Sequence, residues 1–134
     1  MAKNIIATKN APGAIGPYSQ GIRANGFVFA SGQIGLDPAT GEFVKGGIVE
    51  QSRQALLNVK NVLEAAGSGL DKAVKTTVFL KDINDFAAMN AVYSEFFKTD
   101  CPARSAVQVA ALPKGALVEI EVIAEARFKN GKTG

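Results

Sequence analysis

The chain has 134 residues, of which 47% are hydrophobic and 20% are charged, and its formal net charge at pH 7 is +3. This composition predicts one globular domain over residues 1–134 and excludes a disordered chain. The small charge gives no reason to expect nucleic acid as a partner. The sequence has no histidine and one cysteine, which excludes imidazole-based catalytic dyads and metal sites as well as an intramolecular disulfide.

No apolar run is long enough for a signal peptide, and none approaches the roughly 20 residues that a membrane span requires. We therefore expect a cytoplasmic protein without a membrane partner, which agrees with its single cysteine.

The first third of the chain is predicted to form short strands and loops. Residues 5–8 favour a strand, whereas residues 11–20 contain two prolines and two glycines and favour a loop. Residues 22–24 and 27–31 flank Asn25-Gly26, a strong signal for a two-residue hairpin turn. A further turn is expected over residues 37–41.

Two helices are predicted in the middle of the chain. In residues 48–66, apolar and small residues recur every three or four positions, and Gly67 ends the pattern. After a β-branched strand at 74–80, residues 85–97 carry four aromatic residues and Met89 on one side, with Asn84 as the expected N-cap.

The last two strands are expected at 104–112 and 117–128, joined across Pro113-Lys114-Gly115. The order is then β-β-β-α-β-α-β-β, an α+β domain with two helices on one face of a mixed sheet. In the last strand the even positions from Val118 to Ala126 are all apolar, as a helix-covered face requires.

The other face of this sheet is too apolar for water, since it carries Leu117, Ile123 and several alanines. Because two helices cover only one face, we expect the second face to be buried in a homo-oligomer, with charged residues at the clefts.

Arg104 and Glu119 interrupt these apolar runs and are the strongest candidates for chemistry. The guanidinium of Arg104 can bind a carboxylate with two parallel hydrogen bonds, or it can form a structural ion pair with a glutamate of the sheet. Glu119 lies between Val118 and Ile120, where a carboxylate can hold water and transfer a proton, or it can be a solvated rim residue. Glu121 shares its face, and the pattern hardly separates the two.

Three further positions are weaker candidates. Tyr18 lies in a constrained loop, where it can serve a site or cover the edge of the core. Ser31 can donate a hydrogen bond, and Gly32 allows a ligand to approach the backbone closely. Cys101 has no histidine partner and is not expected to be a nucleophile.

Several blocks together resemble the reactive intermediate deaminase family, the RidA-like imine deaminases also called the YjgF family. The resemblance covers nearly the whole chain. Its blocks are Ala11-Pro12 with residues 15–20, Ser31-Gly32-Gln33-Ile34, residues 54–59, residues 74–80, Asp85-Phe86 with Asn90, residues 102–105, and Glu119-Ile120-Glu121.

The resemblance implies a chorismate-mutase-like fold and a homotrimer with sites at the subunit interfaces. It also implies hydrolysis of 2-imino acids, the enamine and imine products of pyridoxal-phosphate enzymes, to 2-oxo acids and ammonia, without a metal or other cofactor. In the family pattern Arg104 binds the substrate carboxylate and Glu119 positions the attacking water. Tyr18, Ser31 and Asn90 line the pocket, and Gly32 offers backbone contacts. The cysteine that the family often has two residues after the arginine is Ala106 here.

Two other functions stay open from the sequence. One is an endoribonuclease or translation inhibitor, for which the net charge of +3 is weak support, whereas the missing histidine removes the usual acid-base group. The other is a non-enzymatic trimer that binds 2-oxo acids in the same clefts, which would need Arg104 but not Glu119.

Overall fold

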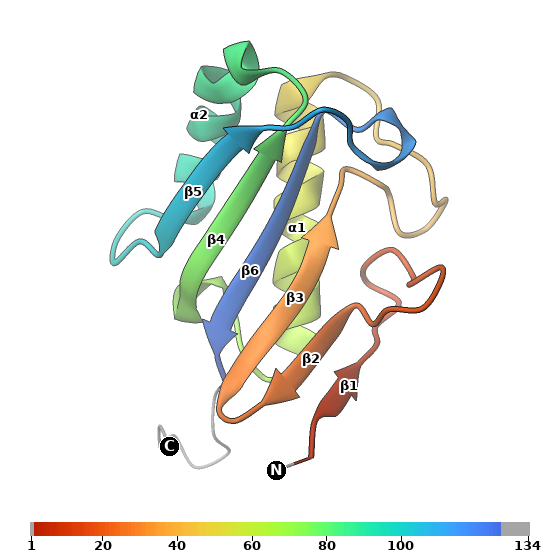
Figure 1. Ribbon diagram of the computed structural model, residues 1–134, viewed down its shortest axis with the longest axis vertical. Helices are drawn as coiled ribbons and strands as arrows, with labels where there is room; N and C mark the ends of the chain where they lie inside the picture. Colours follow the sequence, from red (N-terminus) through yellow and green to blue (C-terminus); the bar gives the residue numbers. More distant parts are fainter. Residues whose placement is uncertain (1, 127–134) are drawn as a thin grey trace.

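A computed structural model describes residues 2–126, which form one six-stranded sheet and two α-helices (Figure 1). The strands are β1 (Asn4–Ile6), β2 (Gly21–Ala24), β3 (Phe27–Gln33), β4 (Ala73–Leu80), β5 (Ala103–Gln108) and β6 (Val118–Glu125). The helices are α1 (Ile48–Ala65) and α2 (Phe86–Phe96), and short 3-10 turns occupy Leu70–Lys72, Ile83–Asp85 and Pro113–Gly115. The predicted element order and the α+β class are confirmed.

The strand order in the sheet is β1-β2-β3-β6-β4-β5, with β4 and β5 parallel and every other neighbouring pair antiparallel. The predicted hairpin is present: Asn25 and Gly26 both have positive φ, 52° and 82°, which a two-residue turn of this kind requires. The C-terminal strand β6 lies in the middle of the sheet, between β3 and β4, so Glu119 is flanked by strands on both sides.

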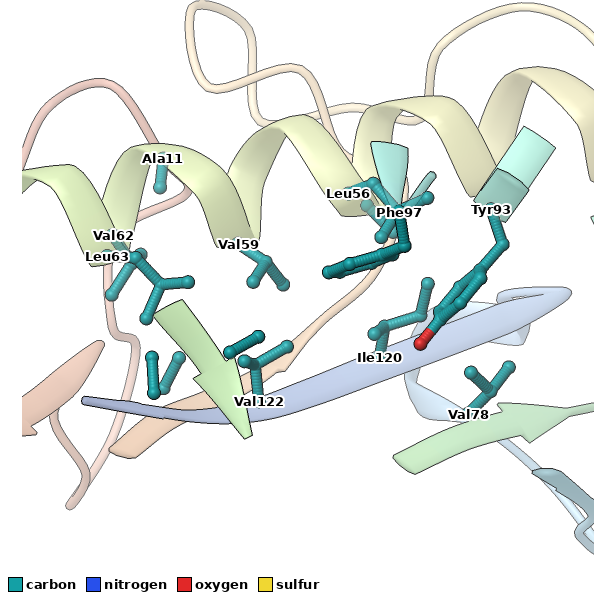
Figure 2. Packing of buried hydrophobic residues seen from close by; sticks show 14 of the residues in the cluster. Ala11, Leu56, Val59, Val62, Leu63, Val78, Tyr93, Phe97, Ile120 and Val122 are labelled. Atoms are coloured by element: carbon teal, nitrogen blue, oxygen red, sulfur yellow. The ribbon is translucent and has the colours of Figure 1, made fainter. Parts of the chain in front are cut away.

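Both helices cover the same face of the sheet, behind it in the view of Figure 1. The hydrophobic core lies between this helix layer and the sheet. The alternation in β6 is as predicted, since Val118, Ile120, Val122 and Ala124 are buried at 0–1% exposure. Leu56, Val59 and Leu63 of α1 meet this row from the helix side (Figure 2). Burial of each such side chain contributes on the order of 2 kcal/mol.

Two polar side chains of α1 fix the loops next to the sheet. The buried Asn58 amide donates to the carbonyl oxygens of Ile34 and Leu36, at 3.1 and 2.9 Å. Gln51 accepts a hydrogen bond from the Leu117 backbone at 3.0 Å. Because buried polar groups are costly to leave unpaired, these contacts hold the loops in one position.

Several predicted boundaries differ from the structure: the first strand, predicted over 5–8, spans Asn4–Ile6, and the strand predicted over 27–31 extends to Gln33. Asn84 is not the N-cap of α2: it lies inside the turn Ile83–Asp85, whose own cap is the side chain of Asp82, and Asp85 precedes the helix without a side-chain cap. Strand β5 ends at Gln108 and not at residue 112, because its partner β4 ends at Leu80, the residue paired with Gln108. The last strand is followed to Glu125, and the predicted positions 127 and 128 lie outside the described residues.

The sheet face opposite the helices is uncovered in this chain and carries large apolar side chains. Phe27, Phe29 and Val107 are 39%, 44% and 43% exposed. This is the apolar second face expected from the sequence, and it continues across β3, β6, β4 and β5. Within residues 2–126, no helix has both the length and the apolar character needed to cross a membrane.

Candidate active site

The loop that precedes β2 is held by one buried side chain, Gln20. Its amide nitrogen donates to the carbonyl oxygens of Thr8, Ala11 and Pro12, at 3.0, 3.2 and 2.7 Å. Its amide oxygen accepts from the Thr8 backbone nitrogen at 2.6 Å. The loop therefore has a defined shape although it contains no regular structure, and it presents Tyr18 beside the end of β3.

A bulge in β3 brings two further predicted residues to the same place. The register with β6 shifts between Ala30, which pairs with Val122, and Gln33, which pairs with Ile120. Ser31 and Gly32 occupy this shift, so the strand bends and the two residues leave the regular alternation. The Ser31 hydroxyl donates to the carbonyl oxygen of Ser19 at 2.5 Å, which joins the bulge to the loop carrying Tyr18.

Tyr18, Ser31, Gly32 and Glu119 together line a cleft of about 650 Å³. Its apolar lining includes Ile15, Ile34 and Leu36, and its charged lining also includes Lys114 and Glu121. Tyr18 is 54% exposed, so it does not cover the edge of the core, which was the alternative left open by the sequence. The cleft combines an apolar lining with a few polar groups, as small-molecule sites do.

Glu119 packs directly against Gly32. A Cβ at position 32 would lie 2.5 Å from the carboxylate oxygen Oε2 of Glu119, closer than any contact allows. Glycine therefore allows Glu119 to lie against the β3 backbone, and any larger residue at this position would displace the carboxylate.

The carboxylate of Glu119 is half-buried, and within residues 2–126 it has no hydrogen-bond or ion-pair partner. Burial raises the pKa of Glu119 above its ordinary value, and the negative charge of Glu121 raises it further. Glu121, two residues on, is exposed. The structure thus separates two residues that the sequence could not, and Glu119 has the surroundings of an acid-base group.

Arg104 lies in a different cluster, beneath α2. Its Nη1 donates to the side-chain oxygen of Asn90 at 2.7 Å, and its Cζ lies 4.6 Å from the centre of the Tyr93 ring and 5.4 Å from that of Phe86. No glutamate or aspartate of the described residues forms an ion pair with Arg104, so the predicted alternative of a structural ion pair is not observed. Its positive charge is held by an amide and two rings and is not neutralised.

The ring under Arg104 is itself fixed. The hydroxyl of Tyr93 is 2.8 Å from Oγ1 of the buried Thr76. Burial raises the pKa of Tyr93 above its ordinary value, so the hydroxyl stays protonated at neutral pH.

The two groups of predicted site residues lie on opposite faces of the sheet. Arg104 pairs in register with Thr76, whose side chain is buried on the helix side, whereas Glu119 pairs with Phe79 on the uncovered side. Tyr18, Ser31, Gly32 and Glu119 thus meet in one cleft, and Arg104 and Asn90 meet elsewhere. Arg104 and Asn90 are not among the residues that line the cleft of Glu119.

Four residues that shape these groups were not predicted: Gln20, Lys114, Thr76 and Tyr93. Lys114 could have been found, because it lies in the Pro-Lys-Gly turn that precedes the strand of Glu119. Gln20 and Thr76 carry no pattern that distinguishes them from surface polar residues. The part of the chain that the structure describes contains no cluster of three metal-ligating side chains. Cys101 is exposed and is not among the residues that line the cleft.

Comparisons of the sequence with known proteins all point to one protein family. The family model described as "Endoribonuclease L-PSP" matches residues 8–126. A RutC family protein of Pyrococcus horikoshii is 58% identical over 91% of this chain and 97% of its own length. A human protein named 2-iminobutanoate/2-iminopropanoate deaminase is 51% identical over 92% of this chain and 90% of its own length.

The fold agrees as well. The solved structure of a Rid family protein from Yersinia pestis, 56% identical in sequence, superposes with a TM-score of 0.91 over 93% of this chain and all of that one.

Proposed function

The chain belongs to the YjgF/RidA family, which is the family of the matching endoribonuclease L-PSP model, and from this we propose that it hydrolyses 2-imino acids to 2-oxo acids and ammonia. The preferred substrates would be 2-iminobutanoate and 2-iminopropanoate, after the names of mammalian relatives about 50% identical to this chain. The RutC name of other relatives specifies no reaction.

The observation that carries the proposal is the half-buried carboxylate of Glu119, which lies in a small-molecule cleft, has a raised pKa and forms no ion pair within the described part of the chain. A carboxylate is costly in such surroundings unless it has a task. Hydrolysis of an imine supplies one, because the reaction needs a base that takes a proton from water and returns it to nitrogen.

In the proposed reaction the protonated imine carbon is the electrophile. Glu119 accepts a proton from the attacking water as the new C–O bond forms, giving a tetrahedral carbinolamine. The carboxylic acid then donates that proton to the amine nitrogen. The C–N bond breaks, the hydroxyl loses its proton, and the products are a 2-oxo acid and ammonium. Orientation and a positioned water suffice, since the substrate is already activated.

The carboxylate of the substrate needs a cation, and Arg104 is the residue we propose for it. Because Arg104 and Glu119 of one chain lie on opposite faces of the sheet, a site that contains both must be shared between copies. Arg104 is on β5, the edge strand, where a neighbouring copy can reach it. The uncovered apolar face around Phe29 and Val107 supplies the surface for assembly, and we propose a homotrimer with three such sites.

The first test is Glu119→Gln with an imino acid generated in situ. This variant keeps the shape of the side chain and removes the basic oxygen. We expect kcat to fall by roughly 10²–10⁴, the usual contribution of an acid-base group, while affinity for 2-oxobutanoate changes little. The matched control is Glu121→Gln, which alters an exposed carboxylate of the same cleft. Equal losses for both variants would contradict the assignment.

The second test asks whether the site is shared. Arg104→Ala and Glu119→Gln chains are each expected to be inactive alone, and co-expressed chains should regain about a quarter of the wild-type activity. That fraction is the random chance that a site combines an intact Arg104 from one copy with an intact Glu119 from the next. Absence of any recovery in a mixed oligomer would mean that the site lies within one chain. Light scattering should give a mass near three times the 14.0 kDa of one chain.

The endoribonuclease name of the family model is less well supported by the cleft. Glu119 and Glu121 both line it, with Lys114 as a single cation, and two carboxylates repel a phosphate backbone. The other alternative is a trimer that binds 2-oxo acids without catalysing a reaction. Turnover of an imino acid would exclude it, whereas binding of 2-oxobutanoate without any turnover would support it.

A further inference from the structure

The guanidinium of Arg104 is held in a way that leaves its hydrogen-bonding edge open. A guanidinium has five N–H donors in one plane and no acceptor. Asn90 accepts from one Nη1 donor at 2.7 Å, the Tyr93 hydroxyl can accept from a second, and the ring of Phe86 uses none. Most of the planar fork therefore remains available for a ligand.

A carboxylate side chain could also hold Arg104 in place, but it would occupy the N–H donors of the guanidinium fork and neutralise the positive charge of Arg104. The ring of Tyr93 leaves the charge uncancelled, because a cation is attracted to the face of an aromatic ring, and the neutral Tyr93 hydroxyl can accept from only one of the donors. Among the described residues no carboxylate forms an ion pair with Arg104. The charge is consequently fixed in place and still free to bind an anion.

The ring that does this is fixed at both ends. Its backbone belongs to α2, and its hydroxyl is 2.8 Å from Thr76 Oγ1 on β4. Thr76 is the register partner of Arg104 across the β4–β5 pair. Figure 2 shows the Tyr93 side chain descending from the helix with its oxygen towards the sheet. Phe86, Asn90 and Tyr93 are spaced i, i+4 and i+7, so one face of α2 supplies all three contacts.

We propose that Tyr93 is a positioning residue for Arg104: its ring, tethered to β4 through Thr76, packs against the guanidinium so that the fork is aligned for a ligand carboxylate. This inference rests on the proposed function only in taking Arg104 as the carboxylate anchor. It does not depend on turnover.

The test compares affinity for 2-oxobutanoate in the assembled wild-type protein, Tyr93→Leu, Tyr93→Phe and Phe97→Leu. Tyr93→Leu removes the ring and should weaken binding about 3- to 30-fold, the range of a cation–π contact at a partly desolvated site. Tyr93→Phe keeps the ring and should recover most of the affinity. In turnover, Tyr93→Leu should raise KM with kcat nearly unchanged, because a carboxylate anchor acts equally on substrate and transition state.

Phe97→Leu is the matched control. Phe97 is a buried aromatic residue whose ring centre lies 4.5 Å from that of Tyr93, and it makes no ring contact with Arg104. It should reduce the free energy of unfolding without changing affinity by more than about twofold. If Phe97→Leu weakens binding as much as Tyr93→Leu, or if Tyr93→Leu binds as the wild type does, the ring is merely part of the core and the inference is overturned.

A spectroscopic measurement needs no variant of Tyr93. The chain has two tyrosines, Tyr18 and Tyr93, so ¹³C-labelled tyrosine gives two assignable sets of NMR signals. Addition of 2-oxobutanoate should shift the Tyr93 signals in the wild type and leave them unchanged in Arg104→Ala. Static Tyr93 signals in a saturated wild-type protein would contradict the inference. If 2-oxobutanoate shifts the Tyr93 signals but the protein does not hydrolyse imino acids, the proposed function is contradicted and the inference about Tyr93 still stands.

Discussion

Gly32→Ala tests the contact between the β3 bulge and Glu119. The added Cβ would lie 2.5 Å from Oε2, 2.8 Å from Cδ and 2.9 Å from Cγ of Glu119, and ordinary contact begins at 3.4 Å. The carboxylate oxygen must therefore move by about 0.9 Å, the difference between 2.5 and 3.4 Å. A displacement of about 1 Å at a reacting group costs on the order of 10² in rate, so we expect kcat to fall about 100-fold.

The same substitution should leave stability unchanged or slightly improved. Gly32 does not have a left-handed φ, and the atoms that must give way belong to the far end of one side chain. Alanine also loses less conformational entropy than glycine on folding, by roughly 0.5–1 kcal/mol. Thermal unfolding of the variant should therefore occur at or just above the wild-type temperature.

The assay is steady-state turnover of an imino acid for the wild type, Gly32→Ala, Glu119→Gln and the double variant. If Gly32→Ala acts by displacing Glu119, its effect should disappear in the Glu119→Gln background, where the displaced group is no longer basic. Independent, multiplicative losses would refute this reasoning and would indicate that Gly32 acts through its own backbone. An unchanged kcat in Gly32→Ala would show that the carboxylate is not the reacting group.

Four further outcomes are expected. Activity should fall as the pH is lowered through the raised pKa of Glu119, with a midpoint above the ordinary 4.5. Glu121→Gln should move that midpoint to lower pH, because it removes a negative charge that raises the pKa of Glu119. An unchanged pH–rate profile in Glu121→Gln would contradict this interaction between the two carboxylates. Arg104→Lys should lower kcat/KM about 10- to 100-fold, since an ammonium cannot form the planar fork, and light scattering should show the oligomer intact. Gln20→Glu should lower the free energy of unfolding by about 1–3 kcal/mol in urea titrations, because it removes the donors to three carbonyl groups. Alkylation of Cys101, which is exposed, should leave turnover largely intact, and strong inhibition would reveal a role for the thiol.

Much of the fold could be read from periodicity. Alternation in the β6 region, three- and four-residue spacing in α1 and the Asn25-Gly26 turn each report a local geometry that burial enforces. The end of β5 could not be found in this way, because it depends on where β4 stops and not on the residues of β5. The expected cap at Asn84 could not be corrected from the sequence either, since Asp82 and Asn84 are both residue types that favour an N-cap and only the structure shows that Asp82 accepts the capping hydrogen bond.

The sequence indicated which residues are candidates for the site but not how they are arranged in space. Ser31, Gly32 and Glu119 could be named from the sequence, but the bulge that brings them together appears only in the register of β3 with β6. Likewise nothing in the alternation around Arg104 states which face belongs to the helices. That information is in the pairing of Arg104 with Thr76, a contact between residues far apart in the chain.

The attachment of the N-terminal loop to Gln20 has a consequence for its motion. One side-chain amide holds Thr8, Ala11 and Pro12, so these residues cannot loosen separately: rotation of that amide breaks every bond together. Loss of the Gln20 contacts is then a single cooperative event, and we expect the backbone N–H of Thr8 to exchange with solvent only when the Gln20 amide is released. Tyr18 lies two residues before Gln20, and its neighbour Ser19 is bonded to the Ser31 hydroxyl, so this wall of the cleft opens only when both the Gln20 amide and the Ser31 hydroxyl release the loop.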